Sequence, residues 1–177
     1  MTAARVPLLV LIGGAPGSGK TTLARELADH LDVPWLSRDP FSRGIRLTEG
    51  TMPSPQRSWD LWYRTLASLL GESVSLVADQ MMYRGLCEPE IEGYLLGRCR
   101  PRLIFCTAPD AFDRFKARES QQHGADSDEY KRVLKVAAEA TPHVAAPPDL
   151  GLEVLMVDTS DGYQPEIQEI VEFCLRR

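Results

Sequence analysis

The sequence lacks the features that mark several protein classes. None of its apolar runs approaches the roughly 20 residues that a membrane-spanning helix needs, and no repeat, low-complexity tract or signal peptide is recognisable. A dense basic tract is also missing, and the net charge is −5, which disfavours a general nucleic-acid binder because such proteins need a basic face. We therefore expect a globular cytoplasmic protein that makes no membrane contact.

Signatures of metal sites are missing as well. The four cysteines are scattered without the spacing of a metal site, and we expect reduced thiols: Cys87, Cys99, Cys106 and Cys174. The three histidines form no motif and are interpreted as surface or structural residues: His30, His123 and His143. Hydrophobic residues, in contrast, make up 44% of the 177 residues, which is enough for the core of one domain. The sequence therefore predicts a single domain over residues 1–177.

A phosphate-binding motif lies near the start of the chain. Gly14, Gly19, Lys20 and Thr21 fit the pattern G-x-x-x-x-G-K-[ST]. The pattern follows a buried apolar run at residues 8–12, which is typical of a strand covered on both faces, and precedes leucines at helical spacing. A glycine-rich turn with a surface lysine is the alternative explanation. The strand and helix on either side make the phosphate loop the better interpretation.

The motif predicts the chemistry of this loop. Inward-turned backbone N–H groups and the positive end of the following helix hold an anion. Lys20 is expected to reach the β- and γ-phosphates of a nucleotide, and the Thr21 hydroxyl to bind Mg²⁺. We therefore predict binding of ATP with Mg²⁺, although the sequence does not separate ATP from GTP. The predicted nucleotide-binding residues are Gly14, Ala15, Pro16, Gly17, Ser18, Gly19, Lys20, Thr21 and Thr22.

Apolar runs alternate with helical patterns along the rest of the chain. Further strands are predicted at residues 33–37, 74–78, 103–107 and 152–157. Pro34 places the first of these at an edge of the sheet, because proline cannot donate to a strand ladder. The alternation predicts a parallel sheet with helices on both faces. Ligands of such sheets bind beyond the carboxyl ends of the strands, and Asp39, Asp79 and Asp158 all follow a strand and are expected at one site.

Two segments are predicted to cover this site. Residues 41–58 are rich in Gly, Pro, Ser and Arg without sustained periodicity, as in a mobile region that covers a substrate. A helix is expected to follow from Trp59. Residues 114–140 begin with basic side chains, and we interpret this region as a lid over the phosphates in which Arg114 or Arg118 is the working arginine. A solvated basic helix face is the alternative.

Two acidic residues fit further parts of phosphoryl-transfer chemistry. Such a reaction needs a carboxylate near the acceptor and a metal besides the phosphate clamp. Asp39 is predicted to accept the proton of an acceptor hydroxyl; the alternative is a helix N-cap with Pro40 as the first helical residue, and both roles can hold. Asp79 ends the run VSLVAD and is predicted to support Mg²⁺, or merely to start a turn.

These residues resemble a known superfamily. The stretch GGAPGSGKTTLAREL, followed by WLSRDPF, VADQMMYR and FKARES, resembles the P-loop kinases. It is most similar to their branch of polynucleotide 5′-hydroxyl kinases, chloramphenicol-phosphotransferase-like enzymes and zeta-toxin-like kinases. The resemblance implies a three-layer α/β P-loop NTPase fold with a parallel five-stranded sheet in the order 2-3-1-4-5. It also implies Asp39 as general base, Asp79 at the metal, and Lys20 and Arg118 as catalytic cations.

The predicted function is an ATP-dependent kinase that phosphorylates a hydroxyl of a small molecule, such as an antibiotic, a sugar or a nucleoside-like metabolite. Pro40, and glutamines at 121 and 122 where polynucleotide kinases are expected to carry further basic lid residues, weaken a nucleic-acid acceptor. A polynucleotide 5′-hydroxyl kinase and a nucleotide-binding switch without significant turnover remain the alternatives. The sequence predicts neither the acceptor nor the oligomeric state. Predicted acceptor-site residues are Asp39, Arg43, Trp59 and Arg84, with Arg46 and Arg57 also available for an anionic substituent.

Overall fold

The computed structural model describes residues 6–51 and 54–176 and contains a five-stranded parallel sheet. Its strands are β1 (Leu8–Gly14), β2 (Trp35–Ser37), β3 (Leu76–Asp79), β4 (Arg100–Thr107) and β5 (Val154–Asp158). They lie in the order β2-β3-β1-β4-β5. The predicted parallel sheet, its order 2-3-1-4-5 and the edge position of β2 are therefore confirmed.

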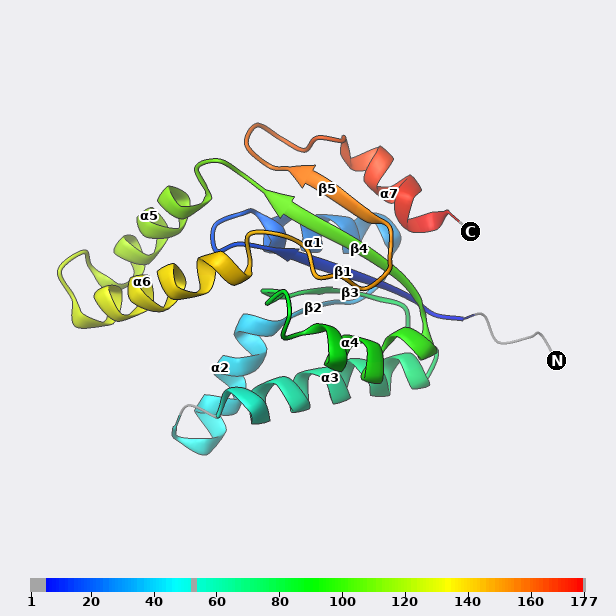
Figure 1. Ribbon diagram of the computed structural model, residues 1–177, viewed down its shortest axis with the longest axis horizontal. Helices are drawn as coiled ribbons and strands as arrows, with labels where there is room; N and C mark the ends of the chain where they lie inside the picture. The colour runs from blue at the N-terminus through cyan, green and yellow to red at the C-terminus, as the bar shows by residue number, and fades with distance from the viewer. Residues whose placement is uncertain (1–5, 52–53, 177) are drawn as a thin grey trace.

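Helices cover both faces of the sheet (Figure 1). They are α1 (Lys20–Leu31), α2 (Arg38–Glu49), α3 (Pro55–Gly71), α4 (Glu88–Tyr94), α5 (Ala111–His123), α6 (Asp128–Ala140) and α7 (Ile167–Leu175), with 3₁₀ turns η1 (Leu96–Arg98) and η2 (Thr141–His143). One face carries α1 and α7, and the other carries α3 and α4. This arrangement gives the expected three layers.

Strand β1 explains why the sheet is buried on both faces. Side chains alternate between the two faces of a strand. Leu9 and Leu11 accordingly pack in the core beneath α3 and α4, whereas Val10 and Ile12 pack in the core beneath α1 and α7. Every residue of β1 is buried. The continuous apolar run at the start of the chain is thus the sequence of a central strand between two helical layers.

The segment at residues 41–58 is largely helical, contrary to the irregular conformation that its composition suggested. Helix α2 begins directly after β2, with Ser37 as its N-cap residue. Helix α3 begins after Ser54, whose hydroxyl accepts a hydrogen bond from the N–H of Arg57 (3.3 Å). Helix α2 buries none of its residues fully, and the Gly, Pro and Ser residues of this segment indicate a loop when the sequence is considered alone. Residues 52–53 of the predicted covering segment lie outside the described residues.

Three helices surround the carboxyl ends of the strands. In Figure 1, α5 and α6 extend as a pair beyond the arrowheads of β4 and β5, and α2 leaves the end of β2 on the other side of the sheet edge. The predicted lid region is thus built as two helices that pack against each other. Across residues 6–51 and 54–176, no helix combines the length and the apolar character needed to cross a membrane.

Candidate active site

The loop between β1 and α1 adopts a conformation that requires glycine. Gly17 has a φ of 82°, and a Cβ atom there would lie 1.9 Å from the carbonyl oxygen of Ala111 at the start of α5. Gly19 is the N-cap residue of α1 with a φ of 75°, and a Cβ atom there would lie 3.0 Å from the hydroxyl of Thr159. The loop is therefore packed between α5 and the segment after β5, and a side chain at either position would displace it.

Unpartnered donors gather at this loop. The first N–H groups of α1 have no intrahelical acceptor, as at every helix start. The Ser18 hydroxyl is buried without a hydrogen-bond partner in the part of the chain that the structure describes. Thr159 donates from its hydroxyl to the carbonyl oxygen of Ser18 (3.0 Å), which ties the loop to the end of β5. Free donors at the positive end of a helix fit an anion such as a phosphate group.

Asp79, at the end of β3, accepts three side-chain hydrogen bonds. Its Oδ2 accepts from the hydroxyls of Thr21 (2.9 Å) and Ser37 (3.2 Å), and its Oδ1 accepts from Nε1 of Trp35 (2.6 Å). The side chain is buried, with 2% exposure. Burial raises the pKa of Asp79 above its ordinary value, although these three donors and Lys20 favour the charged carboxylate. Asp79 is thus a buried acid held by a ring of donors.

Thr21 and Asp79 supply two neighbouring oxygen atoms that fit Mg²⁺. This ion prefers oxygen ligands and is usually bound by one or two protein oxygens together with waters and substrate phosphates. Within the described ranges, no group of three or more His, Cys, Asp or Glu side chains could hold a metal ion.

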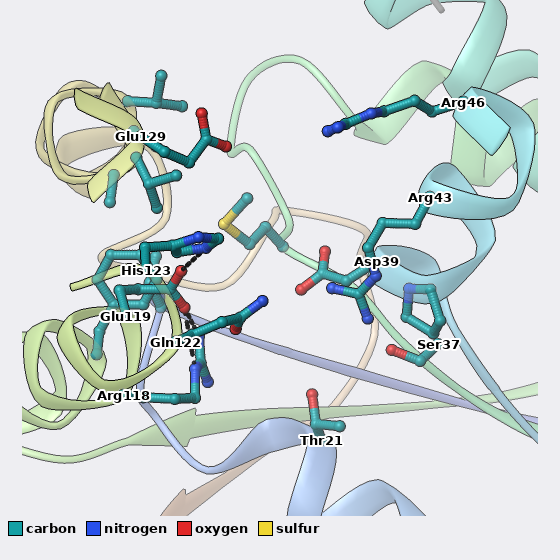
Figure 2. A pocket seen from close by; sticks show the side chains of 18 of the residues that line it. Thr21, Ser37, Asp39, Arg43, Arg46, Arg118, Glu119, Gln122, His123 and Glu129 are labelled. Carbon is teal, nitrogen blue, oxygen red and sulfur yellow. Dashed lines mark hydrogen bonds and ion pairs between the residues drawn. The ribbon is translucent and has the colours of Figure 1, made fainter. Parts of the chain in front are cut away.

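A cavity of about 1190 Å³ opens above this pair, lined at its base by Lys20 and Thr21. Figure 2 shows Asp39 and Arg43 extending from α2 into this cavity, opposite Arg118 on α5. Pockets for a single drug-sized ligand usually measure about 300–1,000 Å³. The cavity therefore has room for the phosphates of a nucleotide and for a second molecule.

Asp39 occupies the first turn of α2. The alternative role of N-cap, with Pro40 as the first helical residue, is wrong because Ser37 is the N-cap residue and the helix already begins at Arg38. The guanidinium of Arg38 turns away from the cavity, lies 3.4 Å from the ring centre of Trp59 and donates to the Ser58 hydroxyl. Asp39 itself lines the cavity and forms no ion pair with a described residue. Its carboxylate therefore faces the cavity without an ionic partner among the described residues.

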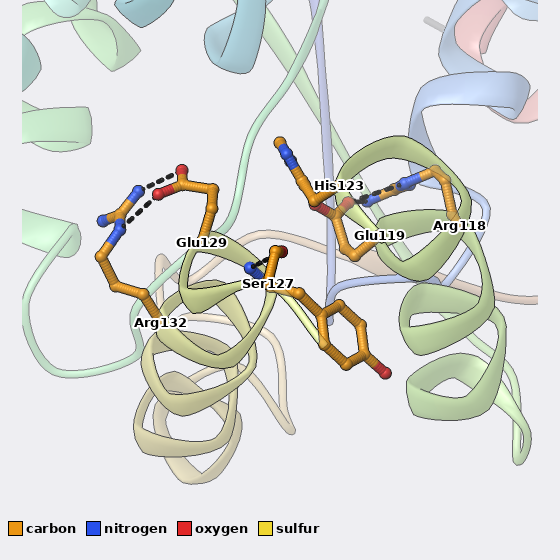
Figure 3. A network of polar contacts seen from close by, with 7 residues as sticks. Arg118, Glu119, His123, Ser127, Glu129 and Arg132 are labelled. Atoms are coloured by element: carbon orange, nitrogen blue, oxygen red, sulfur yellow. Dashed lines mark hydrogen bonds and ion pairs between the residues drawn. The ribbon is translucent and has the colours of Figure 1, made fainter. Parts of the chain in front are cut away.

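The two candidate lid arginines have different surroundings. Arg114 donates to the carbonyl oxygens of Thr159 (3.0 Å) and Ser160 (2.9 Å), which fixes α5 to the segment after β5. It does not line the cavity. Arg118 lines the cavity and donates to Oε1 of Glu119 through Nε (3.1 Å) and Nη2 (2.9 Å), as Figure 3 shows. Of the two, only Arg118 faces the space above the phosphate loop.

The two glutamates of α5 and α6 that line the cavity already have basic partners (Figure 3). Glu119 is 8% exposed and lies between Arg118 and His123, whose Nε2 is 3.6 Å from Oε2 of the glutamate. On α6, Arg132 donates twice to Glu129, at 2.9 and 2.6 Å. This wall of the cavity therefore has its negative charge balanced from within.

Three residues singled out in the sequence lie away from the cavity lining. Trp59 stacks on Tyr63, with 5.6 Å between ring centroids, and Arg84 is exposed to solvent. Asp158 ends β5 but accepts a hydrogen bond from the N–H of Ser160 (2.8 Å). The expectation that all three strand-end aspartates share one site stays a prediction for Asp158. The assignment of Trp59 and Arg84 to an acceptor site stays a prediction.

Trp35 and Ser37 are site residues that sequence reasoning missed. Both lie on β2 and reach Asp79 because β2 pairs with β3 in a register that sets Ser37 beside Asp79. A tryptophan and a serine in a short edge strand indicate ordinary packing when the sequence is considered alone. The available signal was the position of both residues just before Asp39, on a strand whose carboxyl end was already expected at the site.

Comparison with known proteins places the chain in a family. A family model described as an AAA domain matches residues 9–139, which include the phosphate loop, Asp39, Asp79 and Arg118. The chain belongs to the AAA domain family. No curated protein matches the sequence of this AAA domain protein.

Solved structures share the fold of this AAA domain protein. A candidate kinase from Chloroflexus aurantiacus J-10-fl is 24% identical with a TM-score of 0.70, over 96% of this chain and 97% of that chain. A gluconokinase from Sinorhizobium meliloti 1021 is 16% identical with a TM-score of 0.61, over 97% and 91%. The Pnkp1/Rnl/Hen1 RNA repair complex is 18% identical with a TM-score of 0.57, over 80% of this chain and 47% of that one. The fold is therefore that of the P-loop kinases.

Proposed function

We propose that this protein is a kinase that transfers the γ-phosphate of ATP to a hydroxyl group of a small molecule. One observation carries the proposal: the phosphate loop, the Thr21–Asp79 pair and the unpaired carboxylate of Asp39 border the same cavity or its base. A protein that only binds a nucleotide has no need of a free carboxylate opposite the phosphate loop. The shared fold with kinases supports the same class of reaction by analogy.

In this proposal each side of the cavity has its own task. Lys20 and the first amides of α1 bind the β- and γ-phosphates, and Thr21 and Asp79 would hold Mg²⁺, which neutralises charge on the transferred group. The positive charge of Arg118 also stabilises the negative charge that develops on that group. Asp39 takes the proton of the acceptor hydroxyl while the oxygen of that hydroxyl bonds to the γ-phosphorus. The bond between the γ-phosphorus and the β–γ bridging oxygen breaks, which releases ADP.

A polynucleotide 5′-hydroxyl kinase is the second candidate. The likeness to the RNA repair complex favours it, as does the presence of Arg43 and Arg46 along the cavity. The net charge of −5 opposes it, because tracking a phosphate backbone needs a basic surface. Transfer to a 5′-hydroxyl oligonucleotide that falls steeply with added salt would favour this candidate over a small acceptor.

The test is a phosphotransfer assay against a panel of hydroxyl-bearing metabolites and antibiotics, read as ATP consumption and labelled product. Lys20→Ala is expected to weaken ATP binding and depress turnover, because it removes a charge-assisted phosphate contact. Asp39→Asn is expected to lower turnover by roughly 10²-fold or more while ATP affinity stays near the wild-type value. Undiminished turnover in Asp39→Asn would remove the base, and undiminished nucleotide binding and turnover in Lys20→Ala would refute the site.

A further inference from the structure

The wall of the cavity that α2 forms, beside Asp39, carries two arginines without an ionic partner. Arg43 and Arg46 extend from α2 into the cavity, and neither lies within 4 Å of an acidic oxygen of the described residues. Arg57 differs, because Glu49 pairs with it at 2.7 Å. Of the four arginines that the sequence offered to an anionic substituent, those at 43 and 46 are therefore the ones that remain available at the cavity.

Charge on the opposite wall does not cancel these arginines. Glu119 is bound by Arg118, and Glu129 is bound by Arg132. The hydrogen bonds from Arg132, and more weakly the charges of His123 and of Arg46 across the cavity, lower the pKa of Glu129. That glutamate is thus already paired. Asp39 also lines the cavity from α2, but it forms no ion pair with Arg43 or Arg46. The donors of both guanidiniums therefore remain available for an added oxyanion.

Neutral hydrogen-bonding groups are scarce at the same place. Apart from the Trp35 indole, which donates to Asp79, and the His123 ring, which lies beside Glu119, the neutral polar side chains that border the cavity are Thr21, Ser37 and Gln122. The first two already donate to Asp79, which leaves Gln122 as the one amide available among the lining residues. A polyol needs several such partners, because buried hydroxyl groups lose free energy when they are unpaired. The lining therefore suits an oxyanion better than an uncharged sugar.

An apolar stripe completes the cavity. Val133, Val136 and Ala140 follow one another at helical spacing on α6 and line the side opposite α2. Val136 is 52% exposed, and Leu47 on α2, which also lines the cavity, is 87% exposed. Exposed apolar side chains on two facing helices offer a surface that an apolar ring or chain can cover.

We infer that the acceptor is an anionic, amphipathic small molecule, and this inference rests on the proposed kinase function. Its carboxylate or phosphate group pairs with Arg43 and Arg46, its apolar body lies on the α6 stripe, and its hydroxyl points to Asp39. Arginine suits this task because its planar fork donates two parallel hydrogen bonds to an oxyanion. Carboxylate and phosphate share this chemistry, and the experiment separates them.

The test measures binding before it measures transfer. Protein saturated with Mg²⁺ and a non-hydrolysable ATP analogue is titrated by calorimetry with matched probes: shikimate against its methyl ester for the carboxylate, and adenosine 3′-monophosphate against adenosine for the phosphate. At least one anionic probe is expected to bind tenfold or more tightly than its neutral partner. The Arg43→Ala/Arg46→Ala double variant should reduce this preference to below about threefold, whereas Arg64→Ala, which removes an exposed guanidinium on α3, should leave it intact.

Each remaining result decides the matter. Equal binding of anionic and neutral probes, or no binding of any anionic probe by protein that binds the ATP analogue, overturns the inference. Tighter, salt-sensitive binding of a 5′-hydroxyl oligonucleotide also overturns it. An anion preference without phosphoryl transfer to any acceptor would uphold the anion subsite and refute the kinase function. Transfer to neutral acceptors alone would uphold the kinase function and refute the anion subsite. If the double variant fails to bind the ATP analogue, Arg43→Lys and Arg46→Lys are used in its place. A preference for anionic over neutral probes that stays at the wild-type value in these variants counts against pairing through the planar guanidinium.

Discussion

Replacing Trp35 by Phe tests whether the ring of donors around Asp79 is what permits a carboxylate to be buried there. The substitution keeps an aromatic ring on β2 but removes the indole N–H that donates to Oδ1 of Asp79 at 2.6 Å. Thr21 and Ser37 remain as donors to Oδ2. Oδ1 of a side chain with 2% exposure would then lose its only hydrogen-bond partner among the described residues.

The size of the effect follows from that lost bond. A hydrogen bond to a charged group contributes about 1.5–3 kcal/mol, and most of the aromatic packing of residue 35 is kept. For a chain of this length, each 1 kcal/mol corresponds to a change of about 2–4 °C in Tm. We therefore expect the free energy of unfolding to fall by about 2 kcal/mol at neutral pH, with a decrease in Tm of roughly 4–8 °C.

The loss of stability in Trp35→Phe should depend on pH. The indole bond favours the charged carboxylate, so its removal raises the pKa of Asp79 further above the ordinary value of 3.8. Because the folded-state pKa is raised, the contribution of Asp79 to stability is greatest below 3.8 and declines as pH rises through the folded value. The loss caused by Trp35→Phe should therefore be complete at neutral pH and shrink in acid, where Asp79 is protonated in both proteins.

The assay is a double-mutant cycle measured by urea unfolding at several pH values. Trp35→Phe, Asp79→Asn and the double variant give a coupling energy for the pair, which we expect to be about 1.5–3 kcal/mol at pH 7. The neutral amide in Asp79→Asn can still accept a hydrogen bond from the indole N–H. Part of the coupling energy therefore measures only the difference between a charged and a neutral acceptor. A coupling energy below about 0.5 kcal/mol, or a loss that does not change between neutral and acid pH, would refute the reasoning.

Two further predictions follow from the loop and the lid. Arg118→Ala should lower kcat by about 10- to 100-fold with a smaller change in the KM for ATP, because its contact strengthens as charge develops in the transition state; steady-state kinetics checks this, and an unchanged kcat would leave Arg118 a surface residue bound to Glu119. Gly17→Ala should cost about 2 kcal/mol or more of stability and abolish nucleotide binding, since its Cβ atom would lie 1.9 Å from a backbone oxygen at a φ of 82°. Thermal unfolding and calorimetry would show both losses. Gly93→Ala is the control, because nothing lies within 4 Å of a Cβ atom there, and it should be neutral or stabilising by up to about 1 kcal/mol.

The sequence predicted the phosphate loop because its chemistry is local. Four fixed positions within eight residues, between an apolar run and a helical pattern, define a backbone cradle before any tertiary contact is known. The sheet could be predicted from the same kind of local signal, because strands buried on both faces have unbroken apolar sequences. The helix α2 was missed because its segment is rich in Gly, Pro, Ser and Arg, a composition that indicates a loop, and because it buries none of its residues fully.

The functions of the remaining residues depended on which segments the fold brings together. The sequence by itself determined that a phosphate loop, three acidic residues after strands and a basic segment exist, because each is encoded by neighbouring residues. Only the tertiary structure decided that Trp35 and Ser37 donate to Asp79, through the pairing of β2 with β3. It likewise turned Arg43 and Arg46 toward the cavity while it paired Arg57 with Glu49. Arginines alike in sequence acquire different roles because ionic pairing depends on distances that the chain sets only when its helices pack.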